Sequence, residues 1–293
     1  MDFRVIAVPG HGAEDVVVAA DGVVFTGTED GVIHRIVPGG SVEAVANTGG
    51  RPLGIELLPD GRLLVCDARR GLLAVNPSTG AIEDLLGGMR FCNNAAVAAD
   101  GTIYFSDSST VHPIDEWRAE MVEVTRTGRL LRRTPDGTVT VLRDGLAFAN
   151  GVALAGDESF VAVAETAARA IARHWLTGRD DFLVEDLPGY PDNIARGSDR
   201  LIWVSIASPK DPVVERLQRA PVWIRRQVTK IPQSLQPAPK RTVRVQAYDD
   251  DGHLIRDLTG DSTHFHMVTG VREHDGRIWM GSLHEPAVAV LTP

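Results

Sequence analysis

The chain has 293 residues, 43% of them hydrophobic, and its 30 Lys and Arg stand against 39 Asp and Glu, for a net charge of −9. This hydrophobic content suffices for a packed core and excludes a disordered chain. The acidic balance makes the protein a poor nucleic-acid binder, so we expect no nucleic-acid partner.

The first predicted element is a strand over residues 3–9, and six copies of one unit follow it. Each copy has a short apolar strand, a tight turn that is often Asp-Gly, a second strand of branched or aromatic residues, and a third strand. The copies begin at Glu14, Pro52, Asn93, Asn150, Asp192 and Val268. Copies spaced by roughly 40 residues, with about four strands each, are typical of propeller blades. We therefore expect an all-β fold, a six-bladed β-propeller, as a single domain over residues 1–293.

The two ends of the chain are expected to share one blade. Copy six ends at Pro293, too soon for a fourth strand, and residues 3–9 belong to no copy. We expect this N-terminal strand to complete the sixth blade and close the ring, which removes two exposed sheet edges. The alternative, a solenoid of stacked repeats, would need capping ends, and none is apparent.

An insert over residues 208–240 interrupts the fifth copy, and its apolar residues predict short helices cut by Pro212, Pro221 and Pro232. Three interpretations remain open. The insert is a cap over the channel mouth, a peripheral membrane or partner surface, or a decoration packed on blade five. The membrane alternative rests on its frequent Lys and Arg, because basic amphipathic helices favour anionic lipid. Residues 111–123 predict another short helix near the same mouth.

Two further features bear on cellular location. Cys66 and Cys92 do not make a disulfide framework, and we expect both as buried thiols inside strands. The N-terminus has no basic region followed by an apolar stretch, and nowhere do eighteen or more apolar residues run together. We expect a cytoplasmic protein with no transmembrane segment.

One position, seven residues before the recurring turn, carries four oxygen-bearing side chains. Across the six copies it reads Glu14, Leu53, Asn93, Asn150, Asp192 and Val268. In a propeller the first strand of each blade lines the central channel, so these side chains converge. Glu, Asn, Asn and Asp are ligands that a hard cation such as Ca²⁺ accepts. Each residue alone would more often be a turn residue or a solvated charge, but the shared register of four favours a metal site.

The six positions together form a ring around the channel. The residues two places earlier should form a rim above this ring, because strand side chains alternate between faces. They are Gly12, Arg51, Phe91, Phe148, Tyr190 and His266. The three aromatic residues predict a partly apolar entrance. We expect the five rim residues other than the glycine to contact a small-molecule substrate.

Several motifs resemble those of a known family over nearly the whole chain. They include AEDVVVAADGVVFTGTEDG, FCNNAAVAADGTIYFSDSS, GLAFANGVAL, LPGYPDNI and VREHDGRIWMGSL. These are similar to the strictosidine synthase-like branch of the gluconolactonase/regucalcin superfamily. The resemblance implies a six-bladed propeller with a divalent cation, usually calcium, in the channel. It implies Glu14, Asn93, Asn150 and Asp192 as ligands, and Asn193 as a match to a further ligand of the related paraoxonases.

Hydrolases of this family open lactones or cleave esters, and some cleave organophosphates. The mechanism that fits is metal-assisted hydrolysis, in which the cation polarises the substrate carbonyl and stabilises the oxyanion. Asp192 is the candidate general base for the attacking water, and Asn93 the candidate for orienting the carbonyl. We therefore predict a metal-dependent lactonase or esterase.

Departures from the family pattern shape the alternatives. Strictosidine synthase condenses an amine and an aldehyde with a glutamate near the position of Thr269, so condensation is a weak alternative. Phe91 stands where sugar lactonases have an arginine, which favours a less polar substrate. Paraoxonases use a histidine pair, whereas Asp67 stands where one histidine is expected, and His266 is the best remaining candidate. The other alternative is a non-catalytic binding module with a structural ion.

Overall fold

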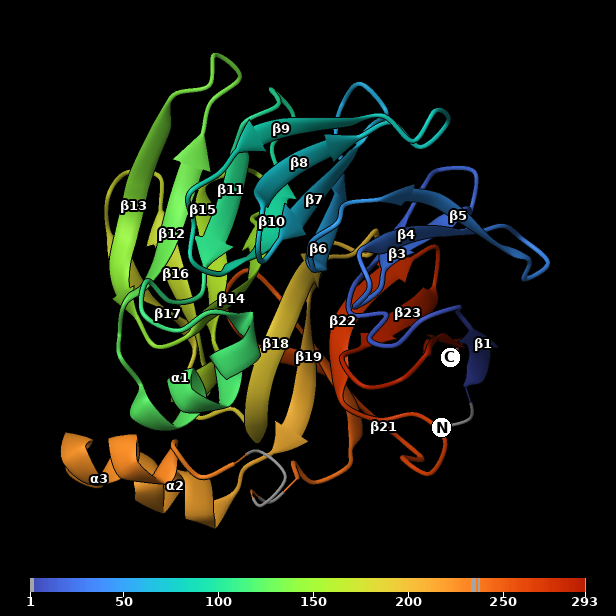
Figure 1. The fold of residues 1–293 in the computed structure, drawn as a ribbon. Helices are drawn as coiled ribbons and strands as arrows, with labels where there is room; N and C mark the ends of the chain where they lie inside the picture. Colours follow the sequence, from blue (N-terminus) through green and yellow to red (C-terminus); the bar gives the residue numbers. More distant parts are fainter. Residues whose placement is uncertain (1–2, 233–235, 237, 293) are drawn as a thin grey trace.

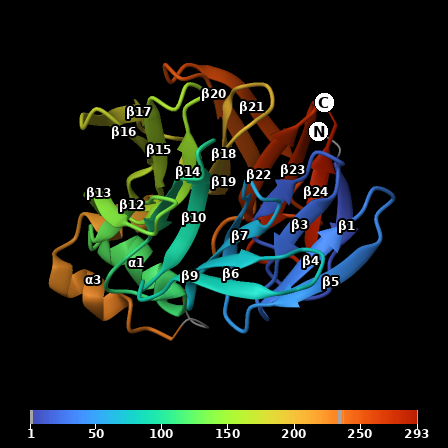
Figure 2. The same ribbon diagram turned by 90° about the horizontal axis from the view of Figure 1, so that it is seen from above.

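Six four-stranded antiparallel sheets make up the described part of the chain, residues 3–232, 236 and 238–292, in this computed structural model (Figure 1). The sheets stand around a common centre as the blades of a propeller (Figure 2). The first strand of each copy contacts the first strands of the two neighbouring copies, so these strands line the centre. The predicted six-bladed β-propeller is confirmed.

Blades one to five each follow chain order from the centre outward. Blade one consists of β2 (Val16–Val18), β3 (Val24–Gly27), β4 (Val32–Ile36) and β5 (Val42–Asn47). Blade two consists of β6 (Pro52–Leu57), β7 (Leu63–Asp67), β8 (Gly71–Val75) and β9 (Ile82–Leu86). Blade three consists of β10 (Cys92–Val97), β11 (Ile103–Asp107), β12 (Gly128–Arg133) and β13 (Val139–Leu146). Blade four consists of β14 (Ala149–Leu154), β15 (Phe160–Glu165), β16 (Ala170–Trp175) and β17 (Asp180–Val184). Blade five consists of β18 (Gly189–Arg196), β19 (Ile202–Pro209), β20 (Val243–Tyr248) and β21 (Leu254–Gly260).

Blade six joins both ends of the chain. It consists of β22 (Val268–His274), β23 (Arg277–Ser282), β24 (Ala287–Leu291) and, outermost, β1 (Arg4–Ala7). Strand β1 pairs antiparallel with β24, with Arg4 opposite Val290 and Ala7 opposite Ala287. The predicted closure by the N-terminal strand is confirmed.

The recurring turns connect the first and second strands through a residue with positive φ. Gly61 and Gly101 adopt φ values of 82° and 85°, which glycine reaches at no steric cost. In each turn the preceding aspartate fixes the bend: Asp60 Oδ1 accepts from the Arg62 amide at 3.0 Å, and Asp100 Oδ1 from the Thr102 amide at 2.8 Å. In blades four and five, Glu158 and Arg200 take the positive-φ position at 58° and 68°.

Neighbouring blades pack face to face through branched and aromatic side chains. Between blades one and two, for example, Phe25 and Ile33 pack against Leu63 and Val65. Cys66 and Cys92 are buried free thiols in β7 and β10, as predicted.

The short helices all lie at one end of the propeller (Figure 1). Between β11 and β12 are η1 (Ile114–Glu116) and α1 (Trp117–Glu123), and η2 (Thr166–Ala168) follows β15. The insert of blade five contains α2 (Pro212–Gln218) and α3 (Val222–Val228). Helix α2 begins at an Asp211 cap, whose Oδ1 accepts from the Val213 amide at 2.8 Å, with proline in the first turn. Among the described residues, no helix has the length and apolar character needed to cross a membrane.

Candidate metal centre and substrate pocket

The innermost strands share an irregularity at the ring register. In blades two to six their pairing with the second strand shifts between Pro52 and Ile55, Cys92 and Ala95, Ala149 and Val152, Pro191 and Ile194, and Val268 and Val271. In blades two to five each interval contains the ring position and the residue after it. In blade six it contains Thr269 and Gly270, so Thr269, and not the predicted Val268, occupies the ring register. Bulges of this kind re-aim side chains and occur next to functional sites. Two consecutive polar residues, such as Asn93 and Asn94, are thereby freed to make contacts at the centre.

Glycines allow the inner strands to approach closely beside the ring. A Cβ at Gly54 would lie 2.7 Å from the Asn93 carbonyl oxygen, and a Cβ at Gly151 would lie 2.1 Å from the Ile194 amide nitrogen. Any side chain there would push the blades apart. The narrow centre of the propeller therefore depends on these glycines.

The four predicted ligands Glu14, Asn93, Asn150 and Asp192 are buried and line the same pocket. Each has one buried side-chain oxygen with no hydrogen-bond partner among the described residues: Glu14 Oε2, Asn93 Oδ1, Asn150 Oδ1 and Asp192 Oδ1. Buried polar atoms are normally satisfied, and leaving four unsatisfied is costly. An oxygen-coordinated divalent cation would satisfy all four, so the residues present fit the predicted ion.

Neighbouring hydroxyls fix the two amides in the orientation that a cation needs. Asn93 Nδ2 donates to Ser108 Oγ at 2.9 Å, and Asn150 Nδ2 donates to Thr166 Oγ1 at 3.1 Å. Because the amide nitrogens are used in this way, the carbonyl oxygens are left for the centre. Ser108 and Thr166 each follow the second strand of their blade, a place that sequence reasoning did not single out.

We expect Ser108→Ala to weaken calcium binding by about tenfold or more, because outer hydrogen bonds orient the ligands. The Asn93 amide would lose its 2.9 Å anchor while all four ligands remain. Isothermal titration calorimetry with calcium measures the effect. Ser78→Ala, in an exposed turn of blade two, is the matched control and should bind as the wild type does. Equal affinity for Ser108→Ala would show that the anchor is unimportant.

Burial destabilises the charged form of the two carboxyl groups at the centre, Glu14 and Asp192. Burial raises the pKa of Glu14, and Arg51, whose Nη2 lies 3.8 Å from Glu14 Oε2, lowers it in part. Burial also raises the pKa of Asp192, and the negative charge of Asp15 raises it further. Positive charge at the centre would offset both the desolvation and the repulsion.

A second set of polar contacts lies beneath the ring and ties blades together. Asp15 Oδ2 accepts from the Ile55 amide at 3.2 Å and from Asn94 Nδ2 at 3.1 Å. Asn94 Oδ1 in turn accepts from the Val152 amide at 2.9 Å. These contacts connect blades one to four. Asp15 and Asn94 were not predicted as site residues, although a polar residue directly after a predicted ring ligand in a strand was an available signal.

The pocket above the ring has a cavity of about 240 Å³ with mainly apolar walls. Phe91, Phe148 and Tyr190 of the predicted rim line it, and the rings of Phe91 and Phe148 lie 5.8 Å apart. The opposite walls come from α1 and the insert, through Trp117, Met121, Val213, Val214 and Leu217. The insert therefore caps the channel mouth, which is the first of the three interpretations.

Three predicted site residues lie outside the walls of this pocket. Arg51 contacts the ring through Glu14. Asn193 is buried, and its side-chain amide has no hydrogen-bond partner among the described residues. His266 is paired through Nδ1 with Glu285, and its ring packs edge-on against His284 at 5.5 Å.

A cluster of two aspartates and a histidine on blade five has a structural explanation. Asp249, Asp251 and His253 cluster in the turn between β20 and β21, on the outer part of blade five. Asp249 Oδ1 accepts from the backbone amides of Asp251 at 3.0 Å and His253 at 2.8 Å. These contacts define the turn, so the cluster is separate from the predicted centre.

Comparison with known families matches residues 93–179 to strictosidine synthase and residues 1–36 to the strictosidine synthase-like N-terminal family. The adipocyte plasma membrane-associated protein of Rattus norvegicus is 34% identical over 316 residues, which cover 96% of this chain and 83% of the rat protein. The Arabidopsis thaliana protein STRICTOSIDINE SYNTHASE-LIKE 10 is 34% identical over 261 residues, covering 82% of this chain and 69% of the plant protein.

Solved structures share the fold at low sequence identity. A gluconolactonase from Xanthomonas campestris has a TM-score of 0.71 at 18% identity, covering 99% of this chain and 90% of that protein. A calcium-binding regucalcin from Agrobacterium tumefaciens has a TM-score of 0.70 at 13% identity, covering 99% of this chain and 93% of that protein. This likeness establishes the common propeller architecture.

Proposed function

Because the chain belongs to the strictosidine synthase-like family, we propose that it is a divalent-cation-dependent hydrolase of lactones or esters with an apolar portion. The observation that carries the proposal is the set of four buried oxygens without partners at the base of an apolar pocket. An all-oxygen donor set favours calcium. The names of two structural neighbours, a gluconolactonase and a calcium-binding regucalcin, agree with this proposal.

The proposed roles follow from where the side chains lie. Glu14, Asn93, Asn150 and Asp192 would hold the cation. When bound, a divalent cation polarises a substrate carbonyl and stabilises the oxyanion that develops. Asp192 is the general base that accepts a proton from the attacking water. Asn93, fixed by Ser108, helps to orient the carbonyl.

The apolar portion of the substrate packs against the aromatic rim and α1. Phe91, Phe148 and Trp117 supply flat surfaces, and the cap residues Val214 and Leu217 cover them. Burying the substrate in this way positions it and limits the access of bulk water. A sugar-derived lactone would leave its hydroxyls without partners against these walls, so we propose a less polar substrate.

Thr269 favours hydrolysis over condensation. Its hydroxyl donates to the Glu14 carbonyl oxygen at 2.9 Å, and its own carbonyl oxygen accepts from Ser205 Oγ at 2.6 Å. The residue at the position of the strictosidine synthase glutamate is therefore a neutral, buried tie between blades six, one and five. It offers no acid or base for joining an amine to an aldehyde.

The test is hydrolysis of a panel of lactones and aryl esters whose apolar portions increase in size, before and after chelation and after calcium is restored. We expect kcat/KM to rise with apolar size until the cavity of about 240 Å³ is filled. Chelation should abolish turnover, and calcium should restore it. Turnover that survives complete removal of metal would contradict the proposed mechanism.

A further inference from the structure

The cap has a charge opposite to that of the whole chain. We use this name for residues 208–240, of which the structure describes all but 233–235 and 237. Seven Lys and Arg and only two Asp and Glu fall in this segment, whereas the chain carries −9 overall. The cap is therefore a basic region on an acidic protein, at the end of the propeller where the helices lie (Figure 1).

Large apolar side chains are exposed among these basic residues. Trp223 is 68% exposed, Val213 is 59% exposed, and Val222 and Ile231 are also exposed. Single exposed apolar residues are ordinary, but a tryptophan this exposed beside other apolar side chains indicates an interaction surface. The nearby exposed basic residues are Arg216, Arg219, Arg226 and Lys230.

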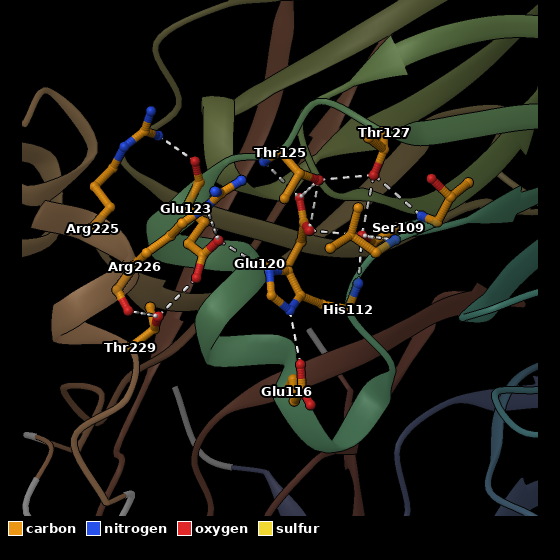
Figure 3. Close-up of polar contacts among 12 residues, drawn as sticks. Ser109, His112, Glu116, Glu120, Glu123, Thr125, Thr127, Arg225, Arg226 and Thr229 are labelled. Carbon is orange, nitrogen blue, oxygen red and sulfur yellow. Dashed lines mark hydrogen bonds and ion pairs between the residues drawn. The ribbon is translucent and has the colours of Figure 1, made fainter. Parts of the chain in front are cut away.

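Polar contacts with α1 hold α3 in this orientation (Figure 3). Arg225 Nη1 donates to the Glu123 carbonyl oxygen, and Thr229 Oγ1 donates to Glu123 Oε1 at 2.7 Å. Arg226 Nε lies 3.7 Å from Glu123 Oε2, which His112 Nε2 also approaches at 3.4 Å. One side of α3 is thereby fixed on α1. Trp223 is exposed on a helix that is held in place.

The exposed apolar and basic side chains share one surface. Val111, Val222, Trp223 and Lys230 line a single open groove between α1 and α3. Glu116 and Glu123 also line it, and Arg226 lies there paired with Glu123. Tryptophan has an apolar ring and a polar N–H, which suit the boundary between headgroups and acyl chains. Lys and Arg reach phosphate groups from long apolar stems. The combination matches the chemistry of an anionic lipid surface.

We propose that the cap docks on anionic phospholipid membranes, with Trp223 and Val222 entering the headgroup region and exposed basic side chains such as Lys230 contacting lipid phosphates. The positive cap also orients the acidic protein, because the rest of the chain is repelled by the same surface. Docking depends on the exposed face of the cap and is independent of which substrate the pocket hydrolyses. A protein partner is the alternative occupant, and the following experiment separates the two.

The test uses the full chain with vesicles of phosphatidylcholine alone or with roughly 30% phosphatidylserine, followed by sedimentation. We expect binding to the anionic vesicles only, and loss of binding at high salt. Lys230→Gln, which leaves the contacts between α1 and α3 intact, should lower the partition coefficient about fivefold, because each basic charge near such a surface contributes about that much. Trp223→Ser should lower it about tenfold and remove the vesicle-induced blue shift of tryptophan emission.

The matched control is Ile255→Ser with Arg256→Gln on β21, an exposed apolar and basic pair at the outer edge of blade five. This variant should bind anionic vesicles as the wild type does. Circular dichroism confirms that each variant is folded. If the wild type does not bind anionic vesicles, or if the cap variants bind equally well, the proposal is wrong, and the surface is assigned to a protein partner instead.

Discussion

Asp192→Asn is expected to reduce kcat for ester or lactone hydrolysis by about 100-fold to 10,000-fold, the range in which general bases contribute. The substitution keeps an oxygen at the position of the unsatisfied Asp192 Oδ1, so a ligand for the cation remains. It removes the carboxylate that accepts the proton from water. Steady-state kinetics at saturating calcium measure the loss, and metal analysis of the same sample reports occupancy.

The matched control for this variant is Asp21→Asn, in the exposed turn after β2. It removes one negative charge far from the pocket and should leave kcat unchanged. Asp192→Asn with bound calcium and full turnover would show that another group acts as the base. Loss of both metal and turnover would make Asp192 mainly a ligand, and the base assignment would then be withdrawn.

Calcium is expected to raise the melting temperature of the wild type by several degrees, and chelation should reverse the shift. A ligand at 100 times its Kd stabilises the folded state by about 2.7 kcal/mol. Asn150→Ala removes one of the four unsatisfied oxygens, so most of this calcium-dependent shift should disappear. Differential scanning calorimetry with and without calcium measures both effects, and neither depends on knowing the substrate.

Asn76→Ala is the control for that experiment. Asn76 Oδ1 accepts from the Ser78 amide at 2.9 Å in an exposed turn, so the variant loses a side-chain oxygen outside the centre. Its calcium-dependent shift should equal that of the wild type, even if its absolute stability is lower. An undiminished shift in Asn150→Ala would argue against the proposed ligand set.

The convergence of the four predicted ligands was predictable because the turn fixes strand register. Counting back from the turn gives the same strand position in blades one to five, and pairing with the second strand keeps that position at the centre. In blade six the turn is one residue shorter, so the count reaches Val268 where the structure places Thr269. This reasoning holds even where the glycine is missing, since Glu158 and Arg200 adopt the same positive φ. The register therefore predicted that Glu14 and Asp192, far apart in the chain, share one pocket.

The details beside the ring were not predictable from alternation alone. The count from Asp275 places His266 on the rim, but the ring register of blade six falls on Thr269, so Met267, two residues before it, lines the pocket in place of His266. The bulges at the ring register also present Asn94 in addition to Asn93. Such irregularities depend on how neighbouring blades meet, which a single repeat does not encode.

The short helices of the cap were predictable from proline spacing, whereas their position was not. Helix α3 lies on α1 because of contacts between Glu123 and the residues Arg225 and Thr229. Glu123 lies about 100 residues before Arg225 and Thr229 in the sequence. No local sequence pattern marks any of the three as a contact residue. The position of α3 therefore depends on tertiary contacts between distant parts of the chain.

Pairing of β1 with β24 sets the order in which the protein matures during translation. Strand β1 is synthesised long before β24, so blade six forms only after β24 has left the ribosome. Until then β1 has no partner strand and blade six is incomplete, so the closed ring that brings Glu14 and Asp192 into one pocket has not formed. On the proposed ligand set, a cation held by both residues would bind closed rings in preference to nascent chains, and metal uptake would follow closure of the ring.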